Sequence, residues 1–303
     1  MDGLYTFMKI SLIIPTKNKL SRLKAALLSL KYQINPEFET IVVNDGGDDI
    51  SSIFSEIDYP HRYIVINQPN KGRAASRNNG ACSAHSENLI FLDDDCMVRP
   101  DFIHNKIIQT QNMDANHVFH GIIYNFSYLK FFEDPFNGVL YNEFKTNNAE
   151  FLKSQVFSYD DIKCFSPILK KTKSKFTKLE KSIHTIFNKN LKKLNWLCCV
   201  GGNITIKREL FDSVNGFDEN FGKEWGCEDL EFGYRLQKKS VTFYFDKENP
   251  VFHLDHYRQG SDELLKKAFD YFFQKHRDLN IKRVLNHFFL KNENIEAVYE
   301  LLD

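Results

Sequence analysis

The chain has 303 residues, a length that predicts one large domain or two closely joined lobes. Lys and Arg together number 40, as do Asp and Glu, so no bulk positive charge points to nucleic acid as a partner. The six cysteines form no C-x-x-C pair. Residues 1–8 lack the features of a signal peptide, and no apolar stretch approaches the ~20 residues of a membrane helix. We therefore expect a cytoplasmic protein with reduced thiols and neither a zinc site nor a disulfide framework.

The first hundred residues alternate between strand and helix patterns. Short apolar runs predict buried strands at Ile10–Ile14, Thr40–Val43, Tyr63–Ile66 and Leu89–Leu92. Helical spacing of apolar or small residues predicts helices over Leu20–Leu30 and Gly72–Ala84. Apolar strands that alternate with helices indicate an α/β fold with a mostly parallel sheet covered on both faces.

The pattern loosens after residue 100. A strand is expected at His117–Ile123, and 125–195 is predicted to be a long, polar, largely helical insertion. Regular structure is expected to return at Trp196–Ile206, followed by a helix over Glu228–Lys238. The later elements expected are strands at Val241–Phe245 and Val251–His256 and two terminal helices within 261–303.

Polar residues directly follow each of the first four predicted strands. These clusters are Pro15–Asn18, Asn44–Gly47, Gln68–Arg77 and Asp93–Asp95. In open α/β sheets, ligands bind at the carboxyl ends of the strands. Four such clusters therefore predict one binding site at this edge.

The acidic triplet Asp93–Asp95 ends the fourth predicted strand. Adjacent carboxylates near a buried strand repel one another and resist removal from water, so a positive partner is expected. A Mg²⁺-type cation that carries a phosphate would fit, because such ions take oxygen ligands from carboxylates and phosphates. The alternative is a solvated loop or a helix cap.

Two further clusters have both a functional and a structural interpretation. Asp45 in its Gly-flanked turn could accept a hydrogen bond from a base edge, or could simply form an Asx-turn. Arg73 and Arg77 lie one turn apart at a helix start, which suits a diphosphate, although an ordinary surface helix is the alternative. The segment lacks G-x-G-x-x-G, which disfavours a nicotinamide enzyme.

The second half carries three more candidate groups. Gly202 and Asn203 precede a predicted strand where paired glycines permit close approach to a ligand, or form a bulge. In the segment Trp225–Asp229, an aromatic face could hold a sugar ring while a carboxylate takes a proton from a hydroxyl; acids in a helix's first turn are the alternative. His253 and His256 could complete a metal shell, although a lone His is more often a packed or surface residue.

Taken together, these segments resemble the family 2 glycosyltransferases of the GT-A fold. The first-half matches are Ile13–Asn18, Ile41–Gly46, Asn70–Gly72, Arg77–Asn78 and Phe91–Asp95. The stretch from Gly201 to Asp229 resembles the acceptor half shared by galactosyl- and N-acetylgalactosaminyl-transferases and chondroitin-type polymerases. The resemblance covers residues 9–256, apart from 125–195.

The resemblance implies roles for individual residues on the donor side. The residues it assigns to the nucleotide sugar are Pro15, Thr16, Asn18, Asp45, Arg73, Arg77, Asp93 and Asp94, with Pro15, Thr16 and Asp45 on the base and Arg77 on the diphosphate. Asp93 and Asp95 would be the D-x-D pair that holds Mn²⁺ or Mg²⁺. His253, or as second choice His256, would complete the metal shell.

The resemblance also implies an acceptor side and a mechanism. Gly202, Asn203, Trp225 and Gly226 would contact the donor or acceptor sugar. Asp229, beside Glu228, matches the catalytic base of inverting members, and Cys227 departs from a common Gly. The implied reaction is metal-dependent inverting transfer from a nucleotide sugar, most readily a UDP-sugar, to a glycan, lipid-linked or peptide acceptor.

The expected organisation follows the same division. One GT-A catalytic domain is expected over 1–260, with a nucleotide-binding half at 1–100, an acceptor half at 101–260, and a helical extension at 261–303. Residues 170–194 are rich in lysine with apolar residues at helical spacing. This segment could contact the inner membrane surface, cover the acceptor site, bind an acidic partner, or be a solvated helix packed on the domain.

Two other classes of function remain open from the sequence. A sugar-1-phosphate nucleotidyltransferase would need a Gly-rich, Arg-containing loop after the first strand, where Pro15–Asn18 stands. A non-catalytic nucleotide-sugar-binding module would keep the fold but not need Asp229.

Overall fold

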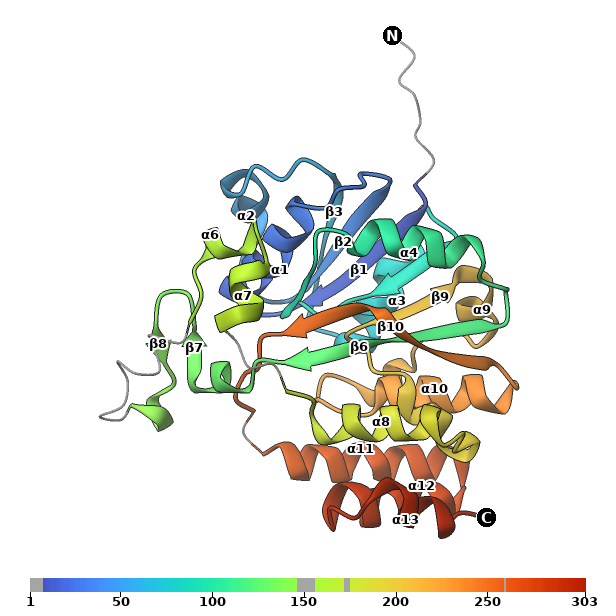
Figure 1. Cartoon of the computed structure of the whole chain (residues 1–303). Helices are drawn as coiled ribbons and strands as arrows, with labels where there is room; N and C mark the ends of the chain where they lie inside the picture. The colour runs from blue at the N-terminus through green and yellow to red at the C-terminus, as the bar shows by residue number, and fades with distance from the viewer. Residues whose placement is uncertain (1–7, 146–155, 172–174, 259) are drawn as a thin grey trace.

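The computed structural model describes residues 8–145, 156–171, 175–258 and 260–303. An eight-stranded sheet forms the centre, with helices on both faces (Figure 1). In sheet order its strands are β3 (Arg62–Gln68), β2 (Phe38–Asp45), β1 (Ile10–Thr16), β4 (Asn88–Phe91), β9 (Ile204–Lys207), β6 (His117–Asn125), β10 (Thr242–His253) and β5 (Cys96–Val98). The predicted α/β architecture is confirmed.

The first four strands are parallel, and so are β6 and β10. Only β9 and β5 run against their neighbours in this sheet. Because β1, β2, β3 and β4 point the same way, the polar residues that follow them reach one edge, as predicted.

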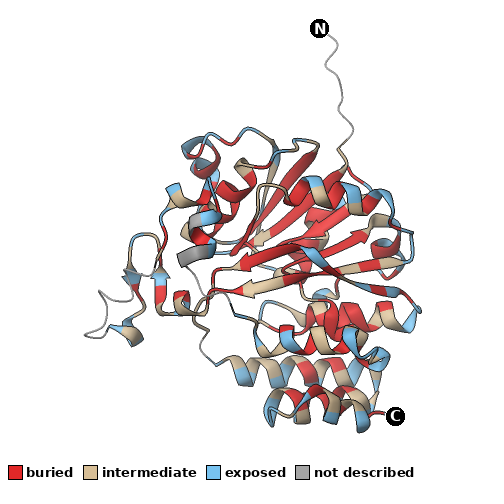
Figure 2. Cartoon of the chain, in the orientation of Figure 1, coloured by how far each residue is buried: buried red, intermediate tan, exposed pale blue. Residues whose placement is uncertain are grey.

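Two apolar cores fill the space between the sheet and its helices, and Figure 2 shows the buried strands that separate them. Successive residues of β1 point to opposite faces, so Leu12 and Ile14 belong to one core and Ile13 to the other. The helices that contribute to the Leu12 core are α1 (Leu20–Lys31), α2 (Ser51–Glu56), α4 (Phe102–Gln111), α6 (Tyr159–Ile162) and α7 (Ser166–Lys171).

The second core holds most of the helical mass from the later part of the chain. Its helices are α3 (Arg73–Ser83), α8 (Lys178–Asn188), the 3₁₀ segment η3 (Lys192–Cys198), α9 (Arg208–Ser213), α10 (Glu228–Lys238), α11 (Ser261–His276), α12 (Leu279–Arg283), the π-helix η5 (Val284–Leu290) and α13 (Ile295–Glu300). Residues beyond 260 therefore share a core with the central sheet. The domain boundary expected at 260 stays a prediction.

Several elements differ from the sequence-based expectation. The two late strands are one strand, β10, whose pairing with β6 shifts register between Asp246 and Val251. Residues 261–303 form four helical segments instead of two. The remaining elements are η1 (Ser127–Phe131), β7 (Phe132–Asp134), β8 (Val139–Leu140), η2 (Asn142–Phe144) and η4 (Glu219–Phe221). The insertion contains a short hairpin, β7 and β8, between the 3₁₀ segments η1 and η2 and ahead of its α-helices. The elements α2, α4 and β5 were not expected.

The lysine-rich segment 170–194 packs its apolar face inward. Ile183 and Ile186 of α8 are 0% exposed and belong to the second core. The apolar face is thus not available to a lipid surface, and a membrane contact stays a prediction that depends on the lysines alone. Residues 172–174 of this segment lie outside the described part of the chain. Within the described residues, no helix is both long and apolar enough to cross a membrane. All six cysteines are free thiols, as expected.

Candidate active site

A cavity of about 110 Å³ lies where β1 and β2 end, and we call it the sheet-edge cavity. It brings together seven residues that the sequence assigned to one site, Pro15, Thr16, Asp45, Arg73, Arg77, Asp93 and Asp94. Lys17, Lys19, Lys223 and Arg258 add positive charge to its lining. The cavity therefore combines acids with a surplus of cationic side chains.

The acids of the triplet have different partners and different pKa values. Thr16 donates a hydrogen bond to Asp94 at 2.7 Å, and the Lys19 ammonium lies 3.2 Å from Asp94 and 2.7 Å from Asp95. Burial raises the pKa of Asp94. Burial also opposes ionisation of Asp95, but Lys19 and His253 outweigh it and hold the Asp95 pKa well below its usual value. Asp95 is therefore a permanent carboxylate at neutral pH.

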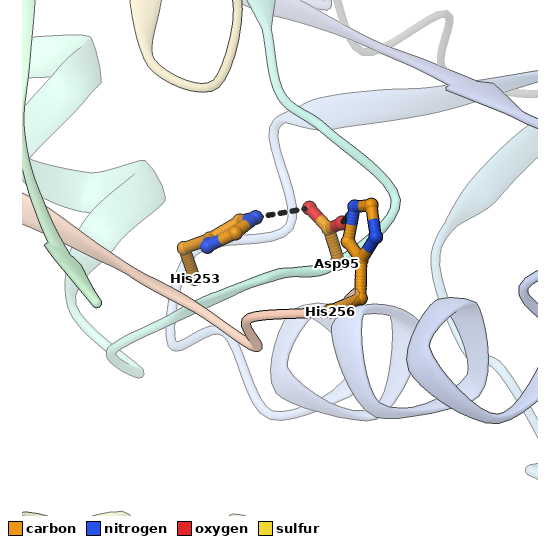
Figure 3. Close-up of side chains that lie close together, drawn as sticks. All are labelled: Asp95, His253 and His256. Carbon is orange, nitrogen blue, oxygen red and sulfur yellow. Dashed lines mark ion pairs between the residues drawn. The ribbon is translucent and has the colours of Figure 1, made fainter. Parts of the chain in front are cut away.

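Asp95 lies in one cluster with His253 and His256 (Figure 3). Nε2 of His253 lies 3.4 Å from one carboxylate oxygen of Asp95, and Nε2 of His256 lies 3.3 Å from the other. Nδ1 of His253 donates to the side-chain oxygen of Asn125 at 2.8 Å, which directs Nε2 toward Asp95. Their ligand atoms lie within 4.8 Å of one another, so this set fits a divalent ion.

Burial keeps one imidazole of the cluster neutral. It lowers the pKa of His256 to about 4, so at neutral pH Nε2 of His256 carries a lone pair, which accepts an N–H of Arg258 at 2.9 Å. Burial also disfavours charge on His253, but the Asp95 carboxylate reverses the balance and raises the His253 pKa. An ion bound by Asp95 would compete with that proton and with the Lys19 ammonium.

Arg77 joins acids from the two halves of the chain. It is 2% exposed and donates to Asp93 at 2.9 Å and to Glu228 at 2.8 Å. A Cβ on Gly201 would lie 2.3 Å from the guanidinium, so a glycine there leaves room for Arg77. Asp93 pairs with Arg77 and lies outside the Asp95 cluster, so its place on the metal stays a prediction.

Asp229 is held at the start of α10 by backbone donors. The N–H groups of Gly201 and Leu230 donate to its two oxygens at 3.0 and 2.8 Å. Burial, with the neighbouring Glu228 charge, raises the Asp229 pKa to about 6. A carboxylate with such a pKa is mostly ionised at pH 7 and still accepts a proton readily. Since Arg77 engages Glu228, Asp229 is the better placed of the two acids to act as a base.

A second cavity, of about 310 Å³, is lined by Asp229 and is called the Asp229 cavity below. Trp225 and Gly202, which were predicted to contact the sugar, also line it, together with Glu228 and with His253 of the predicted metal shell. Arg73, Arg77, Asp93 and Arg258 line both cavities, so the two are adjoining parts of one site.

Comparison with known proteins identifies the family. The model of "Glycosyl transferase family 2" matches residues 11–214, which is more than half of the chain. The chain belongs to glycosyl transferase family 2. A second model, "N-terminal domain of galactosyltransferase", matches residues 181–257, the stretch that contains Asp229 and both histidines. The resemblance inferred from the motifs is thereby confirmed.

Curated relatives agree with the family assignment. A protein of Bacillus subtilis described as uncharacterized glycosyltransferase YfnE is 29% identical over 82% of this chain and 65% of its own length. The validoxylamine A glucosyltransferase of Streptomyces hygroscopicus subsp. jinggangensis is 25% identical over 89% of this chain and 61% of its own. The family 2 chain thus spans less than two thirds of the length of these relatives.

Solved structures confirm the GT-A fold. Staphylococcus aureus TarS, residues 1–349, matches with a TM-score of 0.54 at 18% identity, over 93% of this chain and 72% of that one. The Pyrobaculum calidifontis mannosyltransferase PcManGT, solved with GDP-Man and Mn²⁺, matches with a TM-score of 0.55 at 13% identity, over 97% and 73%. At such identities the likeness concerns the fold alone.

Four residues assigned to the site by the motifs make structural contacts, and three of them, Asn18, Asn203 and Gly226, line neither cavity. Asn18 has a positive φ and accepts a hydrogen bond from the Asp48 N–H, which shapes the loop after β1. Asn203 is fully buried and donates to the Asn249 carbonyl at 3.0 Å; unlike its neighbour Gly202, it lines neither cavity.

Asp45 and Gly226 are the other two. Both carboxylate oxygens of Asp45 accept hydrogen bonds, from Gln68 and from the backbone of Lys71 and Gly72, so Asp45 holds the loop before α3 as well as lining the sheet-edge cavity. Gly226 has a φ of 135° and packs on α11, where an added Cβ would lie 3.1 Å from Ala268. Its role is to let the chain turn before α10.

Sequence reasoning missed four residues that hold or complete the site. Lys19 follows the recognised motif Ile13–Asn18 by one residue. A positive charge beside that motif was a usable signal for a partner of the acidic triplet. Arg258 lies 4.9 Å from the Trp225 ring and donates to His256 at 2.9 Å, with no motif to mark it. Asn125 orients His253, as described above. Arg22 is 2% exposed and donates to the carbonyls of Leu254 and Asp255, which lie between the two histidines.

Proposed function

We propose that this chain transfers a sugar from a UDP-sugar donor to a hydroxyl group of a glycan, lipid-linked or peptide acceptor, with inversion at the anomeric carbon. One observation carries the proposal: a cationic cavity at the sheet edge adjoins a cavity lined by the raised-pKa carboxylate of Asp229. A donor on one side and a base on the other are what a single displacement requires.

The sheet-edge cavity is the donor site in this proposal. Arg73 and Arg258 line both this cavity and the Asp229 cavity. They are therefore placed to face the diphosphate that joins the nucleoside of the donor to its sugar. TarS has been solved with UDP-GlcNAc, and GalNAc-T7 with UDP, GalNAc and Mn²⁺. These complexes support a nucleotide-sugar donor for a chain of the same fold.

Asp95, His253 and His256 would hold the metal. Two imidazoles beside one carboxylate suit Mn²⁺ better than Mg²⁺, which prefers oxygen ligands. When bound, the ion supplies positive charge that offsets the charge developing on the leaving diphosphate. Asn125 and Arg22 keep the histidine segment in place for this task.

Asp229 acts on the acceptor. Its carboxylate takes the proton of the attacking hydroxyl while the acceptor oxygen bonds to the anomeric carbon and the bond to the diphosphate oxygen breaks. The nucleoside diphosphate leaves with the bonding electrons, and the proton remains on Asp229. Because attack and departure occur on opposite faces, the anomeric configuration inverts. Arg77 donates a hydrogen bond to the Glu228 carboxylate, so Glu228 does not compete with Asp229 for the proton.

A panel of UDP- and GDP-sugars tests the proposal. With Mn²⁺ present, we expect at least one UDP-sugar to raise the melting temperature and to be hydrolysed slowly to UDP. The Asp95→Asn variant should lose the metal-dependent stabilisation, whereas Lys223→Met, which changes one cation of the same cavity, should keep most of it. Formation of UTP and sugar 1-phosphate from the UDP-sugar when pyrophosphate is added would indicate a nucleotidyltransferase. Stabilisation by a donor with no turnover in the presence of any acceptor would indicate a binding module.

A further inference from the structure

Part of the lining of the Asp229 cavity is apolar, and none of its residues lines the sheet-edge cavity; we call this part the apolar wall. It is formed by Ile123, Leu179, Val200, Leu230, Leu265 and Phe289. These six side chains come from six different segments, including the insertion helix α8, the terminal helix α11 and the π-helix η5. Packing between parts of the chain that are distant in sequence therefore builds this surface.

The other groups on this wall are already engaged within the protein. The Glu180 carboxylate faces Nε2 of His120 at 3.1 Å, and the backbone N–H of Glu180 donates to the Thr177 hydroxyl at 3.1 Å. Burial raises the pKa of the Cys227 thiol well above its usual value, so it is neutral. A purely polar ligand pressed against this wall would give up its bonds to water and gain few in return.

The cavity is large enough for an apolar group beside a sugar ring. Its volume is about 310 Å³, against about 110 Å³ for the sheet-edge cavity. An apolar cavity of about 150 Å³ already holds a benzene ring. Asp229 lines the same cavity, so whatever lies against the apolar wall lies next to the proposed base.

We propose that the acceptor carries an apolar group next to the hydroxyl that receives the sugar. The recognised chemistry is an alkyl or aryl aglycone, seated on Leu179, Leu265 and Phe289 while the hydroxyl faces Asp229. This inference rests on the proposed function, since it takes Asp229 as the acceptor base. It assigns acceptor selection to the insertion helix and to the C-terminal helices.

Equilibrium binding of glycoside pairs tests this directly. With UDP and Mn²⁺ present, methyl, phenyl and octyl glycosides of glucose, galactose and N-acetylglucosamine are titrated below micelle-forming concentrations, with tryptophan fluorescence as the readout; Trp225 lines the cavity. For at least one sugar, the octyl or the phenyl glycoside should bind at least tenfold more tightly than the methyl glycoside. Comparison of the octyl with the phenyl glycoside distinguishes an alkyl chain from a flat aromatic group.

Variants locate the effect. Leu265→Asn and, independently, Phe289→Ala should reduce the advantage over the methyl glycoside at least threefold. Leu290→Ala, which changes the next residue of η5, is the matched control, because Leu290 is 38% exposed and does not line the cavity. Equal binding of all three glycosides, or an advantage that survives both variants, would overturn the inference.

The two proposals fail in different ways. Absence of UDP release from every donor counts against the proposed transfer reaction. UDP release together with equal binding of methyl, phenyl and octyl glycosides contradicts only the apolar acceptor. The glycoside titration does not require turnover, so it gives a result in either case.

Discussion

The sheet-edge cavity is lined mainly by charged and polar side chains, whereas one wall of the Asp229 cavity is apolar. Most residues of the first lie at or shortly after the ends of parallel strands. The second depends on helices that come from the insertion and from the end of the chain. Within one site, the proposed donor side is therefore a product of sheet topology, and the proposed acceptor side is a product of how distant helices pack. Substitutions on the two sides should separate in their effects.

Arg77 links the two sides, and its loss should have the largest effect. Arg77→Met would leave Glu228 and Asp93 without their cation, and loss of one partner of a buried ion pair costs about 3–5 kcal/mol. Urea denaturation should show a fall in the free energy of unfolding of that order. Arg73→Met is the control, since Arg73 is partly exposed and lies 3.7 Å from Glu228; a fall of equal size in both variants would contradict the bridging role of Arg77.

Loss of Asp95, the proposed metal ligand, should affect the proposed donor side alone. We expect Asp95→Asn to weaken Mn²⁺ binding at least 100-fold, because loss of a group that only orients a metal ligand already costs 10–100-fold. Calorimetric titration of Mn²⁺ with UDP present measures this. The matched change Asp94→Asn should have a much smaller effect, since Asp94 lies outside the cluster of Asp95 and the histidines. Equal loss in both variants would show that the triplet binds metal as a unit.

Arg22 should act on the donor side through the histidine segment. Arg22→Lys cannot reproduce the guanidinium bonds to Leu254 and Asp255, so we expect Mn²⁺ affinity to fall about tenfold. Arg62→Lys, a change of the same type on the far edge strand β3, should leave the affinity unchanged. If Mn²⁺ affinity in Arg22→Lys equals that of the unchanged protein, the carbonyl contacts do not position the histidines.

The pH dependence of the transfer rate should report on Asp229, and the pH dependence of donor affinity should report on His253. The Asp229 pKa is raised to about 6, and only the ionised carboxylate can take the acceptor proton. Transfer should therefore fall as pH decreases through 6, about tenfold between pH 7 and pH 5. Because the His253 pKa is also raised, donor affinity is measured at each pH with saturating Mn²⁺. A transfer rate that stays flat down to pH 5 while donor affinity holds would exclude Asp229 as the base.

The donor side could be predicted from sequence because periodicity carries the information. Apolar strands fix which residues reach the carboxyl edge, so Thr16, Asp45 and Asp93 were placed together correctly. The pattern did not reveal that Asp45 uses both oxygens on Gln68 and the loop before α3, or that Asp93 pairs with Arg77. Those contacts depend on side-chain geometry that strand periodicity does not encode.

The acceptor side could be predicted only in part. The Trp225–Asp229 segment was found because a Trp and a Gly precede its acids. Leu179, Leu265 and Phe289 look like ordinary core residues in the sequence, and only tertiary packing places them beside Asp229. Asn203 shows the opposite error, because a residue within a recognised motif turned out to support the backbone near Asn249.

The most direct test of the account compares turnover and donor binding in Asp229→Asn. Asn keeps the shape of the side chain but cannot act as a base, so transfer should fall by about 10²–10⁴-fold. The dissociation constant of the UDP-sugar with Mn²⁺ should stay within twofold of the unchanged protein, because Asp229 does not line the sheet-edge cavity. Near-full turnover in Asp229→Asn, or donor binding lost together with turnover, would contradict the division of the site into a donor side and a base side.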